Sequence, residues 1–329
     1  MNRRGLLMAF GAAALAEPLA AFSQQQGRTW RIGFFYFGSR QSAMDTGRYG
    51  LFLEGMRELG YVEGKNLVVE ARFADGVQQR LPALADELVR ARVEVIVTGG
   101  GPATIAARAA TKTIPIVITA SPDPVREGLA ASLARPGGNI TGLSGITTDV
   151  GPKQVELLVE TVRNLSRIAV LLNPSNPAHP ADAASLRAAA QKAGKQVQVV
   201  RAGTPEEIER GLATLAGSRG DALIVLGDTF FVQQMRQLST LTLKHRLPAI
   251  FQIPEFVLAG GLMSYGANVT GNYRHVATYV DKIIKGAKPG DLPIEQPMKL
   301  ELVVNMKTAK ALGIKIPQSV LLRAERVIE

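Results

Sequence analysis

The alternation of short apolar runs with longer segments of helical period constrains this fold more than any other feature of the chain. From Arg31 onward, runs rich in β-branched residues are expected to form strands at 32–37, 67–73, 93–98, 114–119 and 140–143. Segments with helical spacing separate these runs, as in βα units built around a parallel sheet. The first half of the chain therefore predicts one doubly wound parallel sheet.

A second series of the same kind follows. Strands are expected at 168–172, 197–201, 222–226, 248–251 and 262–265, again with helical segments between them. At roughly 100–200 residues per domain, 329 residues accommodate two such units. The predicted fold class is α/β, with two doubly wound parallel-sheet lobes, and the Gly-, Ser- and Thr-rich stretch 142–151 is the expected first connection between them.

The N-terminus has the pattern of a removable export signal. Arg3–Arg4 precede an apolar run at 5–16, and small residues lead to Ser23, after which we expect cleavage. The paired arginines leave a twin-arginine route open. A retained membrane anchor is the alternative, but residues 17–18, Glu-Pro, interrupt the run well short of the roughly 20 residues that a membrane span needs. We therefore expect residues 1–23 to be a signal peptide and the protein to work in the periplasm.

Composition excludes several classes of protein. The formal charge is +10, or about +9 without the signal, and the Lys and Arg residues are scattered with no basic run and no aromatic interleaving. A nucleic-acid partner is therefore not expected. The chain has no cysteine, which removes disulfides, thiolate zinc sites, Cys nucleophiles and a bacterial lipid anchor. No complete dinucleotide or P-loop motif is present, and no cofactor is expected.

In open parallel sheets, ligands bind beyond the carboxyl ends of the strands, so the loops at those ends are the candidate sites. The loop after residue 98 holds Gly100, Gly101 and Thr104, where glycines allow close backbone approach and a helix begins. An ordinary strand-to-helix turn explains it equally well. After residue 118 come Ser121 and Asp123, which either contact ligand or, more simply, cap a short helix.

In the second half, Asp228, Thr229 and Phe230 follow an expected strand. An aspartate beside aromatic residues suits an ammonium group with an apolar side chain. The alternative is that Asp228 caps a helix while Phe230 fills the core. Further polar or aromatic contacts are expected at Gly38, Ser39, Asn173 and Tyr265.

Aromatic residues near the expected strand ends could stack on an aromatic ligand, although packing in the core explains them as well. They are Phe35, Tyr36, Phe37, Phe230, Phe231 and Phe251. Catalytic patterns are weak. His179, His245 and His275 lie in separate segments without metal-ligand spacing, and we expect them at the surface or capping helices. No catalytic residue and no metal site is therefore predicted.

Several stretches, taken together and in order along the chain, resemble a known family. They are 59–66 (LGYVEGKN), 110–117 (ATKTIPIV), 132–142 (SLARPGGNITG), 260–266 (GGLMSYG), 292–297 (LPIEQP) and 305–313 (NMKTAKALG). In these stretches the sequence resembles the substrate-binding proteins of ABC transporters that include the tryptophan-binding TrpX-like group. The resemblance covers essentially the whole chain after the signal.

That resemblance implies a type I periplasmic-binding fold, with a hinge of three crossing segments between the lobes. The second and third crossings would fall near 265–272 and 297–303. Lobe 1 would comprise residues 24–147 and 268–297. Lobe 2 would comprise residues 148–267 and 298–329.

The resemblance also implies a periplasmic receptor that closes on a small molecule, our best estimate being an aromatic or branched amino acid. Its partners would be an inner-membrane ABC permease and its ATPase, and the receptor itself would be a monomer. Loop 99–104 and residues 121–123 would meet the carboxylate, and Asp228 would face the ammonium. Arg126-Glu127 depart from the small residue often found there in the family.

Two other functional classes stay open at this stage. A ligand-sensing module for a membrane kinase shares the fold and the ligand chemistry. An exported enzyme acting on a small metabolite would need acid, base or nucleophilic groups in the cleft. A sugar-responsive repressor is excluded, because the signal occupies the place of its DNA-binding helices.

Overall fold

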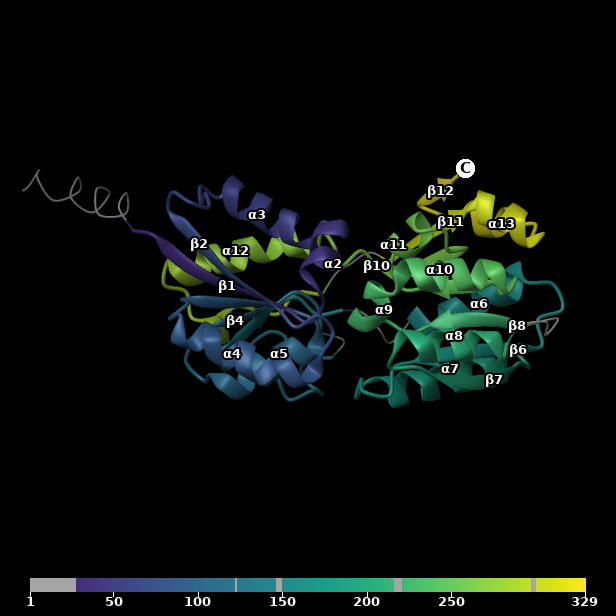
Figure 1. The fold of residues 1–329 in the computed structure, drawn as a ribbon, viewed down its shortest axis with the longest axis horizontal. Coiled ribbons are helices and arrows are strands. Elements are labelled where there is room, and N and C mark those ends of the chain that lie inside the picture. Colours follow the sequence, from purple (N-terminus) through teal and green to yellow (C-terminus); the bar gives the residue numbers. More distant parts are fainter. Residues whose placement is uncertain (1–27, 122, 146–149, 216–220, 297–299) are drawn as a thin grey trace, which may run out of the picture.

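Two α/β lobes lie side by side along the long axis of the computed structural model (Figure 1). The structure describes residues 28–121, 123–145, 150–215, 221–296 and 300–329. The expected signal at 1–23 lies outside the described residues, and so do parts of the first and third expected crossings. Among the described residues, no helix is both long and apolar enough to cross a bilayer.

The first lobe is built on a parallel sheet. Its strand order is β2 (Leu67–Phe73), β1 (Trp30–Tyr36), β3 (Val95–Gly99), β4 (Ile116–Ile118), β5 (Ile140–Gly142). Helices α2 (Arg40–Asp45), α3 (Arg48–Glu58) and α12 (Asn272–Ile284) cover one face, and α4 (Leu81–Arg90) and α5 (Gly101–Ala110) cover the other. Short 3-10 turns lie at Gln78–Arg80 and Pro289–Asp291.

Strand β1 is apolar from Ile32 onward, and its packing shows why. Successive side chains of a strand point to opposite faces. Ile32, Phe34 and Tyr36 enter the core on the α3 and α12 side, whereas Phe35 and Phe37 enter the core on the α4 and α5 side. Both faces are covered, so both sets of side chains are buried.

The second lobe holds a mixed sheet. Its order is β12 (Arg326–Ile328), β11 (Leu300–Asn305), β10 (Met263–Ala267), β9 (Ala249–Phe251), β8 (Asp221–Val225), β6 (Arg167–Leu172), β7 (Gln196–Arg201). The five strands predicted here are present. Strand β12 was not predicted, whereas β11 overlaps the third expected crossing at 297–303 and pairs antiparallel to β10. The described pairings of the second sheet are therefore all parallel except that between β10 and β11.

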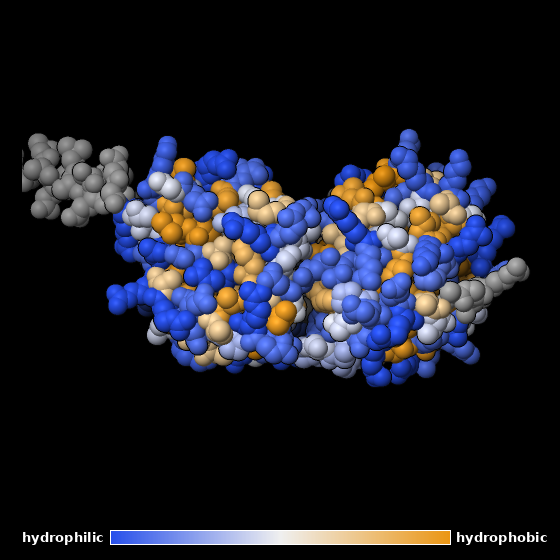
Figure 2. All heavy atoms as spheres, in the orientation of Figure 1, coloured by the Kyte–Doolittle hydropathy of each residue, from blue (hydrophilic) through white to orange (hydrophobic). Residues whose placement is uncertain are grey.

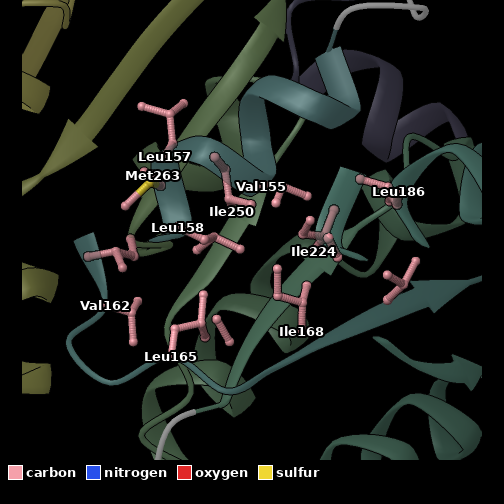
Figure 3. Packing of buried hydrophobic residues seen from close by; sticks show 14 of the residues in the cluster. Val155, Leu157, Leu158, Val162, Leu165, Ile168, Leu186, Ile224, Ile250 and Met263 are labelled. Carbon is pink, nitrogen blue, oxygen red and sulfur yellow. The ribbon is translucent and has the colours of Figure 1, made fainter. Parts of the chain in front are cut away.

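Helices cover both faces of this sheet as well. On one face lie α6 (Val150–Thr161), α7 (His179–Lys192), α13 (Met306–Leu312) and α14 (Gln318–Leu321). On the other lie α8 (Pro205–Ala213), α9 (Thr229–Gln233), α10 (Met235–Lys244) and α11 (Glu255–Leu258). Figure 3 shows the first of these cores, where Val155 and Leu158 of α6 and Leu186 of α7 pack with strand residues such as Ile168 of β6 and Ile224 of β8.

The chain passes between the lobes more than once. After β10 it returns to the first lobe, where α12 packs along α3, and it then enters β11 of the second lobe. Near the junction, Ser144 N donates to Glu295 O at 2.8 Å, so the first and third connections run together. Asn272 Nδ2 donates to Thr119 O at 2.8 Å and ties the second connection to the end of β4. The residue boundaries proposed for each lobe remain predictions.

Candidate functional site

A cavity of about 530 Å³ lies between the two lobes, within the size range of small-molecule sites. Figure 2 shows a hollow at this junction on a face that is otherwise mostly hydrophilic. Its charged and polar side chains include Arg48, Ser121, Arg126, Glu127, Asn173, Asn176, Asp228, Thr229 and Gln252. Its aromatic and aliphatic side chains include Tyr36, Phe37, Ile105, Val232, Ile253, Phe256, Val269 and Tyr273.

Six of the predicted contact residues line this cavity. They are Gly100, Gly101, Ser121, Asn173, Asp228 and Thr229. The carboxyl ends of β3 and β4 in one lobe and of β6 and β8 in the other supply them, as expected for open parallel sheets.

The other six predicted residues lie outside the cavity lining. Ser39 caps α2 by accepting from Ser42 N at 3.0 Å, and Gly38 packs against the ring of Tyr36. Thr104 is buried, and its hydroxyl is 2.8 Å from that of Thr98.

Asp123 caps a turn rather than a helix, since its Oδ1 accepts from Arg126 N at 3.0 Å. Phe230 lies in the core beneath β8, together with the adjacent Phe231. Tyr265 packs against the other core of the second lobe, and its carbonyl accepts from Gln154 Nε2 at 3.0 Å. The alternative interpretation, in which Phe230 fills the core, is therefore correct.

The two lobes approach closely at Gly100. Its φ of +96° is a conformation that favours glycine, and a Cβ placed there would lie 2.9 Å from Thr229 Oγ1 of the opposite lobe. Nearby, a Cβ on Gly76 would lie 2.9 Å from Gln233 Nε2, again across the junction. The two lobes are therefore close to each other at the edge of the cavity formed by Gly76, Gly100, Thr229 and Gln233.

The Asp228 carboxylate is held by donors from two loops of the second lobe. Oδ1 accepts from Phe230 N at 2.8 Å and from Asn173 Nδ2 at 3.2 Å, and Oδ2 accepts from Asn176 Nδ2 at 2.7 Å. The side chain is only 6% exposed. Asp228 is therefore the N-cap of α9 and also part of the cavity wall. A carboxylate has about four acceptor positions, so one remains for a ligand.

His179 is buried next to Asp228 and Asn173 and stabilises their loops by hydrogen bonds. This corrects the expectation that it lies at the surface or caps a helix. It is 1% exposed. Its Nε2 faces the carbonyl of Gly227 at 3.2 Å and must donate there, while Nδ1 accepts from Asn173 N at 2.9 Å. This neutral tautomer joins the loops after β6 and β8, and it fixes Asn173 and Asp228 relative to each other.

Two charged side chains, Arg126 and Glu127, line the first lobe's side of the cavity. Ser121 Oγ donates to Glu127 Oε2 at 2.7 Å. Burial raises the pKa of Glu127 above its ordinary value, although this hydrogen bond opposes the shift. Arg126 lies beside it and also faces Asp123 at 3.9 Å. This is the position where the sequence departs from the family's usual small residue.

Sequence reasoning missed Arg48 and Tyr273, which meet in the wall of the first lobe. Arg48 Nη1 donates to Tyr36 Oη at 3.0 Å, and the guanidinium lies 5.9 Å from the centre of the Tyr273 ring. Arg48 opens α3, where a cation opposes the helix dipole. This unfavourable placement of a cation was the signal in the sequence that could have pointed to Arg48.

The Arg48 side chain is charged as well as buried. Burial alone would lower the pKa of its guanidinium, but Tyr36, Tyr273 and Glu255 outweigh that effect and hold the pKa above its ordinary value. Burial likewise raises the pKa of Tyr273. A buried cation therefore lies beside the phenol rings of Tyr36 and Tyr273.

Among the described residues, no cluster of three His, Asp or Glu side chains could hold a metal ion. Two α/β lobes around a cavity with charged groups in both walls define a class of protein: a two-lobed receptor for small molecules with a type I periplasmic-binding fold. The resemblance to known proteins narrows this further. The chain belongs to the family of ABC transporter substrate binding proteins, whose model matches residues 40–328.

Individual relatives agree with this assignment. A tyrosine-binding protein of Clostridioides difficile (strain R20291) is 27% identical over 274 residues, which cover 83% of this chain and 78% of that one. The ABC domain in complex with L-Trp from Streptococcus pneumonia matches with a TM-score of 0.82 at 27% identity, covering 91% of this chain and 100% of the other.

A ligand-free, open structure of a substrate binding protein with adhesive properties from Clostridium difficile matches less well. Its TM-score is 0.65 at 26% identity, covering 91% of this chain and 99% of the other. The family resemblance and the two-lobed fold class that the sequence suggested are both confirmed.

Proposed function

We propose that this protein is the exported solute receptor of an ABC importer and that it binds an aromatic amino acid in the cavity between its lobes. The observation that carries this proposal is the cavity itself. Aromatic and aliphatic side chains dominate its wall, while a fixed carboxylate, Asp228, lies in the second lobe. Sites of this composition suit a ligand with one apolar part and a few polar groups.

The wall composition favours an aromatic side chain over a small one. Tyr36, Phe37 and Tyr273 come from the first lobe and Phe256 comes from the second. Phe256 is itself stacked on Phe251 at 4.5 Å between ring centres, which holds its orientation. Rings fixed in this way offer edges and faces to an aromatic ligand at little entropic cost. That relatives bind tyrosine or L-Trp supports the same ligand class.

The arrangement of the lobes supports a closing mechanism. Identity and coverage are nearly equal for the L-Trp complex and for the open, ligand-free structure, yet the TM-scores differ by a wide margin. The lobes of this chain therefore sit more as they do in the complex. A ligand drives closure only if it binds the closed state better, which requires contacts with both lobes.

Several further parts of the proposal rest on the sequence pattern and on the family resemblance. The receptor would be exported with cleavage after Ser23, act as a monomer, and deliver its ligand unchanged to a permease with its ATPase. The backbone at Gly100 and Gly101 would meet the ligand's carboxylate end, with Ser121 beside it. Asp228 would pair with the ammonium.

A thermal-shift panel tests the ligand class. Residues 24–329 would be melted with amino acids, purines, sugars and small organic acids, because a ligand that binds only the folded state raises the Tm. We expect L-tryptophan or L-tyrosine to give the largest shift. A large shift with a sugar or purine, and none with aromatic amino acids, would contradict the proposal.

A further inference from the structure

The cavity wall contains a buried cation, Arg48, for which the described part of the chain supplies no counter-charge within ion-pair distance. Arg48 is 4% exposed, and it is absent from the ion pairs formed among the described residues. Among the described residues, its side chain donates one hydrogen bond, to the hydroxyl of Tyr36. A guanidinium has five N–H donors in a rigid fork, so most of its donors remain available.

A buried guanidinium without a counter-charge destabilises the protein unless an anionic partner binds to it. Removing a charge from water costs several kcal/mol unless the charge is paired and hydrogen-bonded. Because Arg48 lines the cavity, the missing partner can come from a molecule inside it. We propose that Arg48 is the anchor for the carboxylate of the ligand, a role that rests on the proposed amino-acid ligand.

The surroundings of Arg48 suit this role. The two phenols beside it fix its position: Tyr36 accepts its hydrogen bond and Tyr273 lies under the guanidinium. Both phenols also border the glycine loop, since a Cβ on Gly99 would lie 2.5 Å from Tyr273 Oη and 2.5 Å from Tyr36 Cδ2. The loop expected to meet a carboxylate through its backbone therefore adjoins the fork that would bind the carboxylate in bidentate fashion.

Arg48 and Asp228 carry opposite charges and lie on opposite lobes. Arg48 belongs to α3 of the first lobe, and Asp228 follows β8 of the second. An α-amino acid carries both complementary charges at one end. A ligand that pairs with both residues contacts both lobes at once, which is the condition for stabilising the closed state.

Glu255 is the alternative partner for Arg48 within the protein. Its Oε1 accepts from Thr270 Oγ1, and its Oε2 is buried with no hydrogen-bond partner. The two side chains interact electrostatically but form no ion pair within 4 Å. If Arg48 served only to balance Glu255, removing it would harm the fold and not the recognition of one ligand group.

The test combines a change in the protein with a change in the ligand. Affinities of residues 24–329 and of the Arg48→Gln variant would be measured for L-tryptophan and for tryptamine, which lacks the carboxylate. We expect the wild type to prefer L-tryptophan strongly. Arg48→Gln should weaken L-tryptophan binding by about thirtyfold or more and change tryptamine binding by less than about threefold.

Two further variants separate a role of Arg48 in ligand recognition from a role in the fold. Tyr36→Phe keeps the ring and removes only the hydroxyl that holds Arg48 in place, so it should lower the preference for L-tryptophan by about fivefold. Glu255→Gln should leave that preference unchanged. Equal losses for both ligands in Arg48→Gln and in Tyr36→Phe would show a structural role and overturn the inference.

Failure of the inference is distinguishable from failure of the proposed function. Wild-type protein that binds L-tryptophan, together with an Arg48→Gln variant that still discriminates against tryptamine, would overturn the carboxylate anchor alone. Wild-type protein that binds neither L-tryptophan nor L-tyrosine would overturn both.

Discussion

Replacing Asp228 with asparagine is expected to weaken the binding of L-tryptophan or L-tyrosine by more than tenfold. The carboxylate is nearly buried and already accepts from Asn173, Asn176 and the backbone of Phe230. Its remaining acceptor position would meet the ammonium, and hydrogen bonds to charged groups contribute about 1.5–3 kcal/mol. Asparagine is also a good N-cap, so α9 should keep its start. Isothermal titration calorimetry measures the change.

A matched ligand and a matched variant make this result specific. Indole-3-propionate lacks the ammonium, so it should bind the wild type and Asp228→Asn with similar affinity. Asp123→Asn changes an aspartate outside the cavity lining and should shift affinity by less than about twofold. If Asp228→Asn bound L-tryptophan as tightly as the wild type, Asp228 would be only a helix cap.

Substituting Gly55 with alanine is expected to cost about 1–3 kcal/mol of stability. A Cβ at this position of α3 would lie 2.4 Å from the backbone oxygen of Arg274 and 2.9 Å from Ala277 Cβ, both on α12. Backbone cannot yield as a flexible side chain can, so the two helices must separate. At roughly 2–4 °C per kcal/mol, the Tm should fall by several degrees.

Gly50 is the internal control on the same helix. Nothing lies within 4 Å of a Cβ placed there. Gly50→Ala should therefore raise stability by about 0.5–1 kcal/mol, because alanine loses less backbone entropy on folding. Calorimetric melting of both variants checks the pair. Equal effects at the two positions would contradict the close contact of α3 with α12 that joins the returning segment to the first lobe.

The sequence predicted most strands of both sheets because the central strands are buried on two faces. In β1, for example, Phe34 and Phe35 point in opposite directions into two cores, so the strand is apolar from Ile32 onward. Strand β12 shows the limit: it has three residues, at the edge of the sheet, with two of them exposed. A short edge strand has no such pattern to detect.

The site could be predicted only where it lies in loops at strand ends. Gly100, Asn173 and Asp228 follow from that rule. Arg48 and Tyr273 do not, because they begin or occupy helices, and α12 joins the first lobe only after the chain has returned from the second. Arg48 on α3 and Tyr273 on α12 are far apart in the sequence, and only the three-dimensional structure shows that they meet in the site.

Calorimetric titration of residues 24–329 with L-tryptophan and L-tyrosine tests the central claim most directly. We expect saturable binding at one site per chain, with a Kd in the micromolar range or tighter for at least one of them. Burial of an aromatic side chain between the lobes should also make the heat capacity change negative. Absence of binding by either amino acid at millimolar concentration would contradict the assignment of this cavity to aromatic amino acids.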